Sequence, residues 1–198
     1  MKTRKFILAS ALFFFLCCVV YWIHVTFLRV NVVFYAAIFD GVLAALATGA
    51  IVWPLRAFSV FGVFEKFQML LIWLLAAYAL AISVPTVLDR SLSFYILEKL
   101  QQRGGGIQQS RFSEVFTHEY VKEHRLVDVR LTEQLESGTI RIDNGCVLLT
   151  DKGRTLASFS RFFRQHLLPK QRLLMGRYSD DLTDPFRHSD AQPDYTCQ

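Results

Sequence analysis

Long apolar runs with few charges fill the first half of the chain, and they constrain its fold more than any other feature. Between residues 6 and 88 the charged and histidine side chains are His24, Arg29, Asp40, Arg56, Glu65 and Lys66. A helix needs about 20 apolar residues to cross the hydrocarbon core of a bilayer. Three stretches meet this requirement, at residues 6–28, 30–53 and 67–88. We therefore predict a mainly α membrane protein whose residues 1–89 form three transmembrane helices.

The second predicted span carries small residues at a regular spacing. Ala37, Gly41, Ala45 and Gly49 recur every four residues. Small side chains at this spacing let the backbone of another helix approach closely. The pattern predicts helix–helix assembly. Assembly with further copies as a homo-oligomer and packing against the chain's own first or third span both remain open.

Asp40 lies near the middle of the same span. A carboxylate at that depth costs about 2.5–3.5 kcal/mol on insertion scales. It must therefore be neutral, paired or in contact with water, and His24 and Thr48 are available partners. We predict that Asp40, His24 and the small residues serve membrane assembly or line a pore. A purely structural hydrogen bond between helices is the alternative.

Positive charges do not settle the orientation of the spans. Lys2, Arg4, Lys5, Arg56 and Lys66 fall on one side, and Arg29, Arg90, Lys99 and Arg103 fall close to the membrane on the other. The positive-inside rule cannot choose between sets so nearly equal. Cys146 and Cys197 stand far apart and alone, which is typical of a reducing compartment. We expect a multi-pass protein of the bacterial inner membrane with its polar domain in the cytoplasm.

The polar residues 90–170 predict a small α+β domain. Helical spacing of apolar residues covers 91–103, 110–121 and 127–136. The period then changes to two around an Asp-Asn-Gly turn at 143–145, which predicts a β-hairpin. Thr150 precedes a last helix over 151–168, and its residue type suits a helix cap. Residues 171–198 carry aspartates and prolines and are predicted to be a disordered acidic tail.

Aromatic and basic side chains alternate along the last predicted helix. Phe159, Phe162 and Phe163 interleave with Arg161 and Arg164. A basic amphipathic helix of this kind lies on lipid or binds nucleic acid. A solvated face opposite a packed one is the plainer interpretation. The net charge of +5 also suits an anionic partner, either nucleic acid or lipid headgroups.

The hairpin and its flanks carry a family resemblance over residues 92–168. The run from Leu149 to Arg154 resembles the wing exit of winged-helix proteins of the MarR and PadR type, and Leu135, Gly138 and Ile140 agree with that pattern. The resemblance implies a third helix in the major groove of DNA and a wing on the phosphates. The implied nucleic-acid or partner contacts are Arg130 and Gln134 for bases and Arg141, Lys152 and Arg154 for the backbone. Glu133 and Glu136 depart from this pattern because they repel phosphate, so protein binding is the alternative.

The sequence carries no motif of a known catalytic centre. It has no Ser/His/Asp set, phosphate-binding Walker loop or zinc signature, so we expect no enzyme, no cofactor and no metal. The architecture resembles the retron-associated transmembrane effectors of antiphage defence. That resemblance implies a reverse transcriptase with its DNA as a nucleoprotein partner, whose release lets the helices permeabilise the inner membrane. The alternatives are a membrane-tethered winged-helix transcriptional regulator and an accessory docking subunit of a larger membrane complex.

Overall fold

The computed structural model describes residues 2–187 and 189. The chain divides into two compact units, residues 1–129 and residues 130–198. The predicted boundary at residue 89 marks the end of the last membrane helix, and the first unit continues beyond it.

Three helices of the first unit are long and apolar enough to cross a membrane. They are α1 (Lys2–Phe27), α2 (Val33–Val52) and a third helix that comprises α3 (Val63–Ala81), the π-helical turn η2 (Ile82–Thr86) and α4 (Val87–Arg90). A helix of sufficient length and hydropathy is thus present at each of the three predicted spans, which indicates a membrane protein. The first and third helices begin four residues earlier than predicted. Their added turns carry the ion pair between Lys2 and Glu65, at 2.6 Å.

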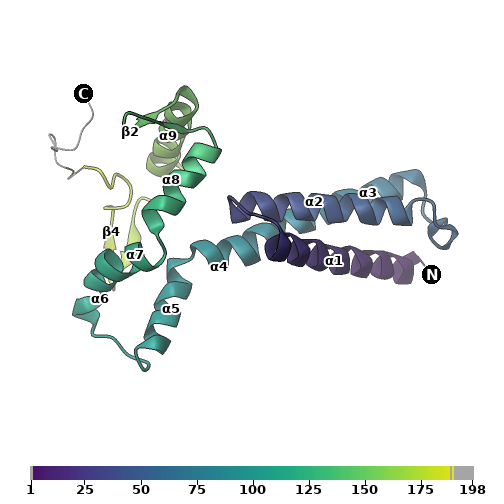
Figure 1. The fold of residues 1–198 in the computed structure, drawn as a ribbon, viewed down its shortest axis with the longest axis horizontal. Helices are drawn as coiled ribbons and strands as arrows, with labels where there is room; N and C mark the ends of the chain where they lie inside the picture. Colours follow the sequence, from purple (N-terminus) through teal and green to yellow (C-terminus); the bar gives the residue numbers. More distant parts are fainter. Residues whose placement is uncertain (1, 188, 190–198) are drawn as a thin grey trace. The chain divides into compact units, whose positions relative to one another are not determined.

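The three membrane helices lie side by side (Figure 1), and they pack through small side chains and aromatic rings. Phe13 of α1 stacks on Trp73 of α3 with 6.0 Å between ring centroids. The Trp73 indole N–H donates a hydrogen bond to Ser10 Oγ at 3.1 Å, so α1 and α3 are joined directly. Ala44 and Ala45 of α2 are fully buried in the same core. A turn of 3₁₀ helix, η1 (Arg56–Phe58), lies between α2 and α3.

Short helices complete the first unit. Helix α5 (Leu92–Gln102) follows the membrane region, and Ser91 caps it by accepting a hydrogen bond from the Phe94 amide. A second helical stretch comprises η3 (Gln109–Arg111), α6 (Phe112–Glu114), the π-helical η4 (Val115–Tyr120) and α7 (Val121–Glu123). Helices were predicted over 91–103 and 110–121, and both are present. Helix α8 (Leu126–Glu136) spans the division between the two units.

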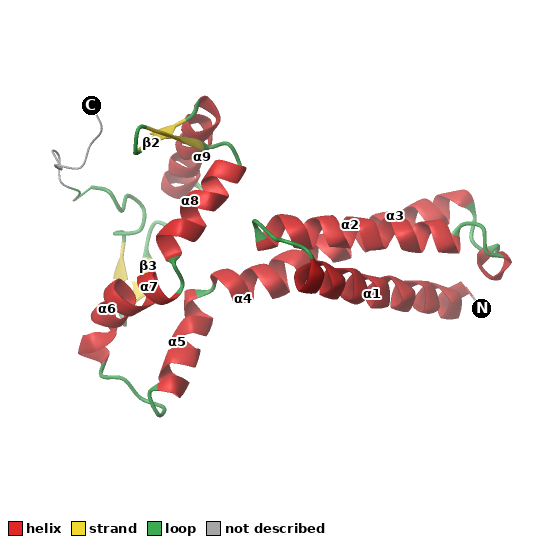
Figure 2. Cartoon of the chain, in the orientation of Figure 1, coloured by secondary structure: helices red, strands yellow, loops and turns green. Residues whose placement is uncertain are grey.

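The second unit contains the predicted hairpin and the last helix (Figure 2). Strands β1 (Ile140–Asp143) and β2 (Cys146–Leu149) pair antiparallel, with Ile140 opposite Leu149. Asn144 and Gly145 have φ values of 49° and 79°, as a tight hairpin turn between twisted strands requires. Helix α9 (Asp151–His166) begins at Thr150, whose hydroxyl accepts a hydrogen bond from the Gly153 amide at 3.1 Å. The predicted order of helix, hairpin and helix is confirmed.

The predicted disorder of the tail is wrong over part of its length. Strands β3 (Arg172–Leu174) and β4 (Arg177–Ser179) form a second antiparallel hairpin. Its turn uses Met175 and Gly176, both at positive φ. Leu173, Leu174 and Tyr178 favour a strand. The prediction gave more weight to the aspartates nearby. Residues 188 and 190–198 of the predicted tail lie outside the described residues.

Candidate functional site

Asp40 and His24 form a polar pair inside the membrane bundle. Asp40 Oδ1 lies 2.6 Å from His24 Nδ1, within hydrogen-bond distance. Asp40 is 1% exposed, and the His24 side chain is 16% exposed. Within the part of the chain that the structure describes, Asp40 Oδ2 is buried and has no hydrogen-bond partner. A carboxylate with one satisfied oxygen is costly in a low-dielectric interior.

The pair joins the first two membrane helices. His24 lies in the last turn of α1 and Asp40 in the second turn of α2, on either side of the connection between these helices. Thr48, the other predicted partner, instead donates to the Ala44 carbonyl of its own helix at 2.7 Å. Two of the predicted membrane residues, His24 and Asp40, are therefore in direct contact.

The small residues of α2 pack within the chain. A Cβ added to Gly41 would lie 2.6 Å from Ala77 Cβ of α3, so the two helices touch at this point. Gly49 is looser, because an added Cβ would lie 3.8 Å from Leu70. Ala37 and Ala45 are buried. Of the two interpretations of this pattern, packing against the chain's own spans is the one that these contacts support.

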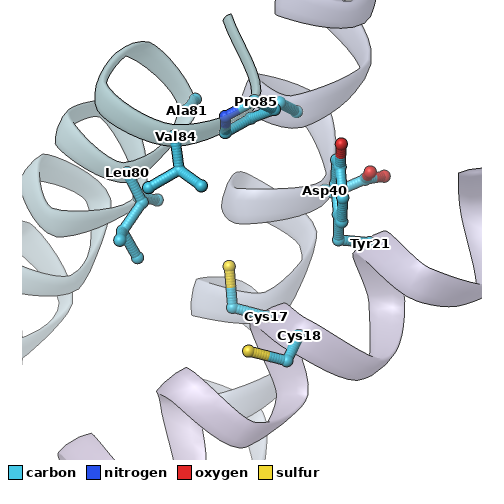
Figure 3. A pocket seen from close by; sticks show the side chains of 10 residues that line it. Cys17, Cys18, Tyr21, Asp40, Leu80, Ala81, Val84 and Pro85 are labelled. Carbon is cyan, nitrogen blue, oxygen red and sulfur yellow. The ribbon is translucent and has the colours of Figure 1, made fainter. Parts of the chain in front are cut away.

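A cavity of about 150 Å³ lies beside Asp40 (Figure 3). Cys17, Cys18 and Tyr21 of α1 line it on one side. The third helix supplies the other side, as Figure 3 shows, with Leu80 and Ala81 of α3 and Val84 and Pro85 of η2.

The third membrane helix changes its hydrogen bonding where it lines this cavity. Pro85 lies inside η2 and has no backbone N–H to donate. The Thr86 hydroxyl donates to the Ala81 carbonyl at 2.7 Å and so satisfies part of the interrupted backbone. π-Helical turns and prolines are common causes of kinks in helices. Sequence reasoning missed this wall of the cavity, although Pro85 within an apolar run was a usable signal.

Four of the five side chains predicted to contact nucleic acid have partners within the second unit. Arg130 pairs with Glu133 at 2.8 Å, and the Gln134 side-chain oxygen accepts a hydrogen bond from Thr139. Lys152 donates to the Ser137 carbonyl at 2.6 Å. The Arg154 guanidinium pairs with Asp151.

Gln134 and Lys152 contact the residues between α8 and β1, whereas Arg130 and Arg154 pair with residues three positions away in their own helices. Arg141, the fifth, is exposed on β1. The structure therefore gives Arg130, Gln134, Lys152 and Arg154 partners within the chain.

A second polar cluster joins α5 to the helical stretch that ends in α7. Lys99 Nζ lies 2.6 Å from a carboxylate oxygen of Glu119 and 2.6 Å from one of Glu123, and its side chain is 3% exposed. These two hydrogen bonds raise the pKa of Lys99. The Lys99 ammonium, followed by the Arg103 guanidinium, lowers the pKa of Glu119. Lys99, followed by the Tyr95 hydroxyl, lowers the pKa of Glu123. All these groups stabilise one another in their charged forms, as a structural network does.

Cys146 is disulfide-bonded. The interpretation of this cysteine as an isolated thiol is therefore wrong. Disulfides form and persist mainly in oxidising compartments, so this bond bears on the side of the membrane at which the second unit lies. Cys17 and Cys18 in α1 are free thiols.

The known protein families, the characterised proteins and the solved structures give no match to this chain. Within the described residues, no group of three or more histidine, cysteine, aspartate or glutamate side chains could hold a metal ion.

Proposed function

We propose that this chain is a non-enzymatic membrane effector of the bacterial inner membrane. Its bundle of three helices permeabilises the bilayer, and its polar region receives the signal that controls the bundle. The observation that carries the proposal is the buried His24–Asp40 pair, in which one carboxylate oxygen has no hydrogen-bond partner among the described residues. A bundle that served only as an anchor would lose no stability if well-packed apolar residues replaced both His24 and Asp40.

The hydrogen bond between His24 and Asp40 is a contact that a small movement of α1 relative to α2 breaks. If α1 and α2 separate at this point, Asp40 loses the only hydrogen-bond partner that the structure gives it and must find water or a group of another chain. The neighbouring cavity and the π-helical turn at Pro85 leave room for the third helix to adjust. Because the small residues of α2 are used inside the chain, the proposed assembly of several copies would use the lipid-facing sides of the bundle.

The proposed trigger is a nucleoprotein, such as a reverse transcriptase with its DNA, that holds the polar region until phage infection. Such a partner requires that region to lie in the cytoplasm. The Cys146 disulfide favours the opposite side, so sidedness is the first property to establish. Fusion of paired reporters at the C-terminus tests it. A C-terminus in the cytoplasm agrees with the proposed nucleoprotein partner, whereas a C-terminus in the periplasm rules that partner out.

Inducible expression in a bacterial host with a membrane-potential dye tests the effector function. We expect the wild-type chain to depolarise the membrane and Asp40→Asn to lose most of this effect, since the amide is isosteric but carries no charge. Gly49→Ala is the matched control in the same helix and should retain activity, because its added Cβ would lie 3.8 Å from Leu70, an ordinary van der Waals distance. Equal amounts of each variant in the membrane are verified by immunoblotting. Harmless wild-type expression, or full activity of Asp40→Asn, contradicts the proposal.

An accessory docking subunit is the second candidate, and one observation favours it. Four of the side chains expected to contact nucleic acid are held in contacts within the chain. This arrangement suits a rigid protein-binding surface better than base reading, and it weakens the case for a transcriptional regulator. Harmless expression together with co-purification of another membrane protein would favour the docking subunit.

A further inference from the structure

We propose that α9 docks on the surface of a bilayer that contains anionic lipid, with its aromatic side among the acyl chains. The feature that prompts this proposal is an exposed apolar stripe. Phe159, Phe162 and Leu167 are each more than half exposed, and Leu156 and Phe163 are at least 40% exposed. At about 100° per residue all five lie on one side of the helix. An uncovered stripe of this kind on a helix requires a partner or a membrane.

Contacts among the described residues of the second unit leave this stripe free. The helix is anchored at its first turn, where an added Cβ on Gly153 would lie 2.1 Å from the Thr139 carbonyl oxygen. Gly153 is the only residue of α9 that is buried. Farther along, residues 183–187 lie across a hollow from Ala157, Ser160, Arg161 and Arg164, on the polar side of α9. The described residues that approach the middle of the helix therefore lie over its arginine side.

The charges of α9 select an anionic surface. Beyond its first turn, α9 carries the basic side chains Arg161 and Arg164 and no carboxylate. Arg154, Arg161 and Arg164 lie on the side opposite the phenylalanines, about half a turn away. An interfacial helix has this arrangement, with its apolar side below the headgroups and its basic side toward phosphate and water.

Nucleic acid and a second copy of the chain suit this arrangement less well. A single strand stacks its bases on aromatic rings while cations on the same side follow its phosphates. Here the rings and the arginines face opposite ways, so one strand cannot reach both. A second copy could cover the phenylalanines, but that contact would make no use of the basic side. The membrane helices add a further argument, because they keep α9 close to a bilayer and raise its effective concentration there.

Hydrogen exchange of the full-length protein in nanodiscs tests the proposal. The probes are detergent micelles, nanodiscs of phosphatidylcholine, and nanodiscs that also contain phosphatidylglycerol. We expect peptides from residues 154–167 to exchange roughly tenfold more slowly in the phosphatidylglycerol nanodiscs than in detergent. Peptides from the β1–β2 hairpin should not change, since this element is not part of the proposed contact.

Two double variants and one control assign any protection to the two sides of α9. Phe159→Ser with Phe163→Ser should remove the protection in both kinds of nanodisc. Arg161→Gln with Arg164→Gln should remove only the additional protection that phosphatidylglycerol gives. Ala157→Ser, on the polar side, should behave as wild type. Unchanged exchange of the β1–β2 peptides verifies that each variant keeps its fold.

Several outcomes would overturn the proposal. Equal exchange in detergent and in both kinds of nanodisc shows that α9 does not meet the bilayer. Protection that requires an added single-stranded oligonucleotide assigns the stripe to nucleic acid. Protection that appears only when two copies share one nanodisc assigns it to self-association. The inference does not depend on the effector function, and harmless expression of the wild-type chain would leave it unaffected.

Discussion

Asp40 has one hydrogen-bond partner, His24, and its second carboxylate oxygen has none among the described residues. The cost of losing His24 therefore falls on an acid that is already only half satisfied. An apolar residue in place of Asp40 removes that cost. The stability that the pair adds to the bundle is therefore a different quantity from the cost of leaving one of its members buried without a partner.

A double-mutant cycle at this pair measures that difference. His24→Leu should destabilise the bundle by about 3–5 kcal/mol because it leaves Asp40 buried without a partner. The double variant His24→Leu with Asp40→Leu should recover most of that loss. Unfolding in mixed micelles, followed by tryptophan fluorescence, provides the free energies. Additive effects of the two single substitutions would mean that the pair is not coupled in the folded bundle.

Gly41 and Gly49 form a matched test of packing within α2. Gly41→Ala should destabilise the bundle by about 1–3 kcal/mol, because the new methyl group collides with Ala77. Gly49→Ala should be neutral or stabilise by up to about 1 kcal/mol, since alanine favours the helix and the space is open. The same micelle unfolding assay reports both. If both substitutions are neutral, α2 and α3 do not pack through Gly41.

At the scale of elements, local patterns predicted most of the fold. Length and hydropathy identified the three spans, and the change of period near residue 140 identified the hairpin. The partner of Asp40 could not be chosen between His24 and Thr48, because helix rotation is set by packing between helices and not by residue spacing. For the same reason the small residues could not be assigned to the contact with α3.

The sequence did not predict two further features of the elements. The π-helical turn at Pro85 depends on how the chain satisfies a missing N–H, and the β3–β4 hairpin depends on short apolar strands among aspartates. The candidate nucleic-acid residues followed from a resemblance, which carries no information on the intramolecular contacts that hold four of them.

The contact between α5 and α7 predicts how this part of the first unit responds to pH. The pKa values of Glu119 and Glu123 are lowered in the folded state, so their stabilisation is complete above the ordinary carboxyl pKa of about 4.3 and is lost as the pH falls through the lowered values. The raised pKa of Lys99 gives stabilisation that persists up to about pH 10.4 and is lost above it.

Hydrogen exchange of peptides from α5, η4 and α7 checks this prediction. Protection should be constant near neutral pH and fall below about pH 4, after correction for the intrinsic exchange rate. Glu123→Gln should weaken protection near neutral pH and reduce its dependence on acid. Protection that is unchanged from neutral pH to pH 3 would show that the network contributes no stability.

At the scale of the whole molecule, a membrane-spanning bundle is joined to polar elements by a segment that proteases can reach. Arg103 ends α5 and precedes Gly104, Gly105 and Gly106, of which the first two have positive φ. Nothing lies within 4 Å of a Cβ added at any of these glycines. A cut after Arg103 would therefore separate the membrane helices and α5 from the rest of the chain.

Trypsin treatment of oriented vesicles uses this segment to determine sidedness. If the polar region lies in the cytoplasm, inverted vesicles should yield a membrane fragment that ends at Arg103, and right-side-out vesicles should yield no cut after Arg103 until they are permeabilised. Arg103→Gln should shift the cut to another exposed basic residue such as Arg111 without changing which vesicles are cleaved. A cut after Arg103 in right-side-out vesicles would place the Cys146 disulfide in an oxidising compartment, where disulfides persist. It would also rule out a cytoplasmic nucleoprotein partner, and the bundle would then need a trigger that acts from outside the inner membrane.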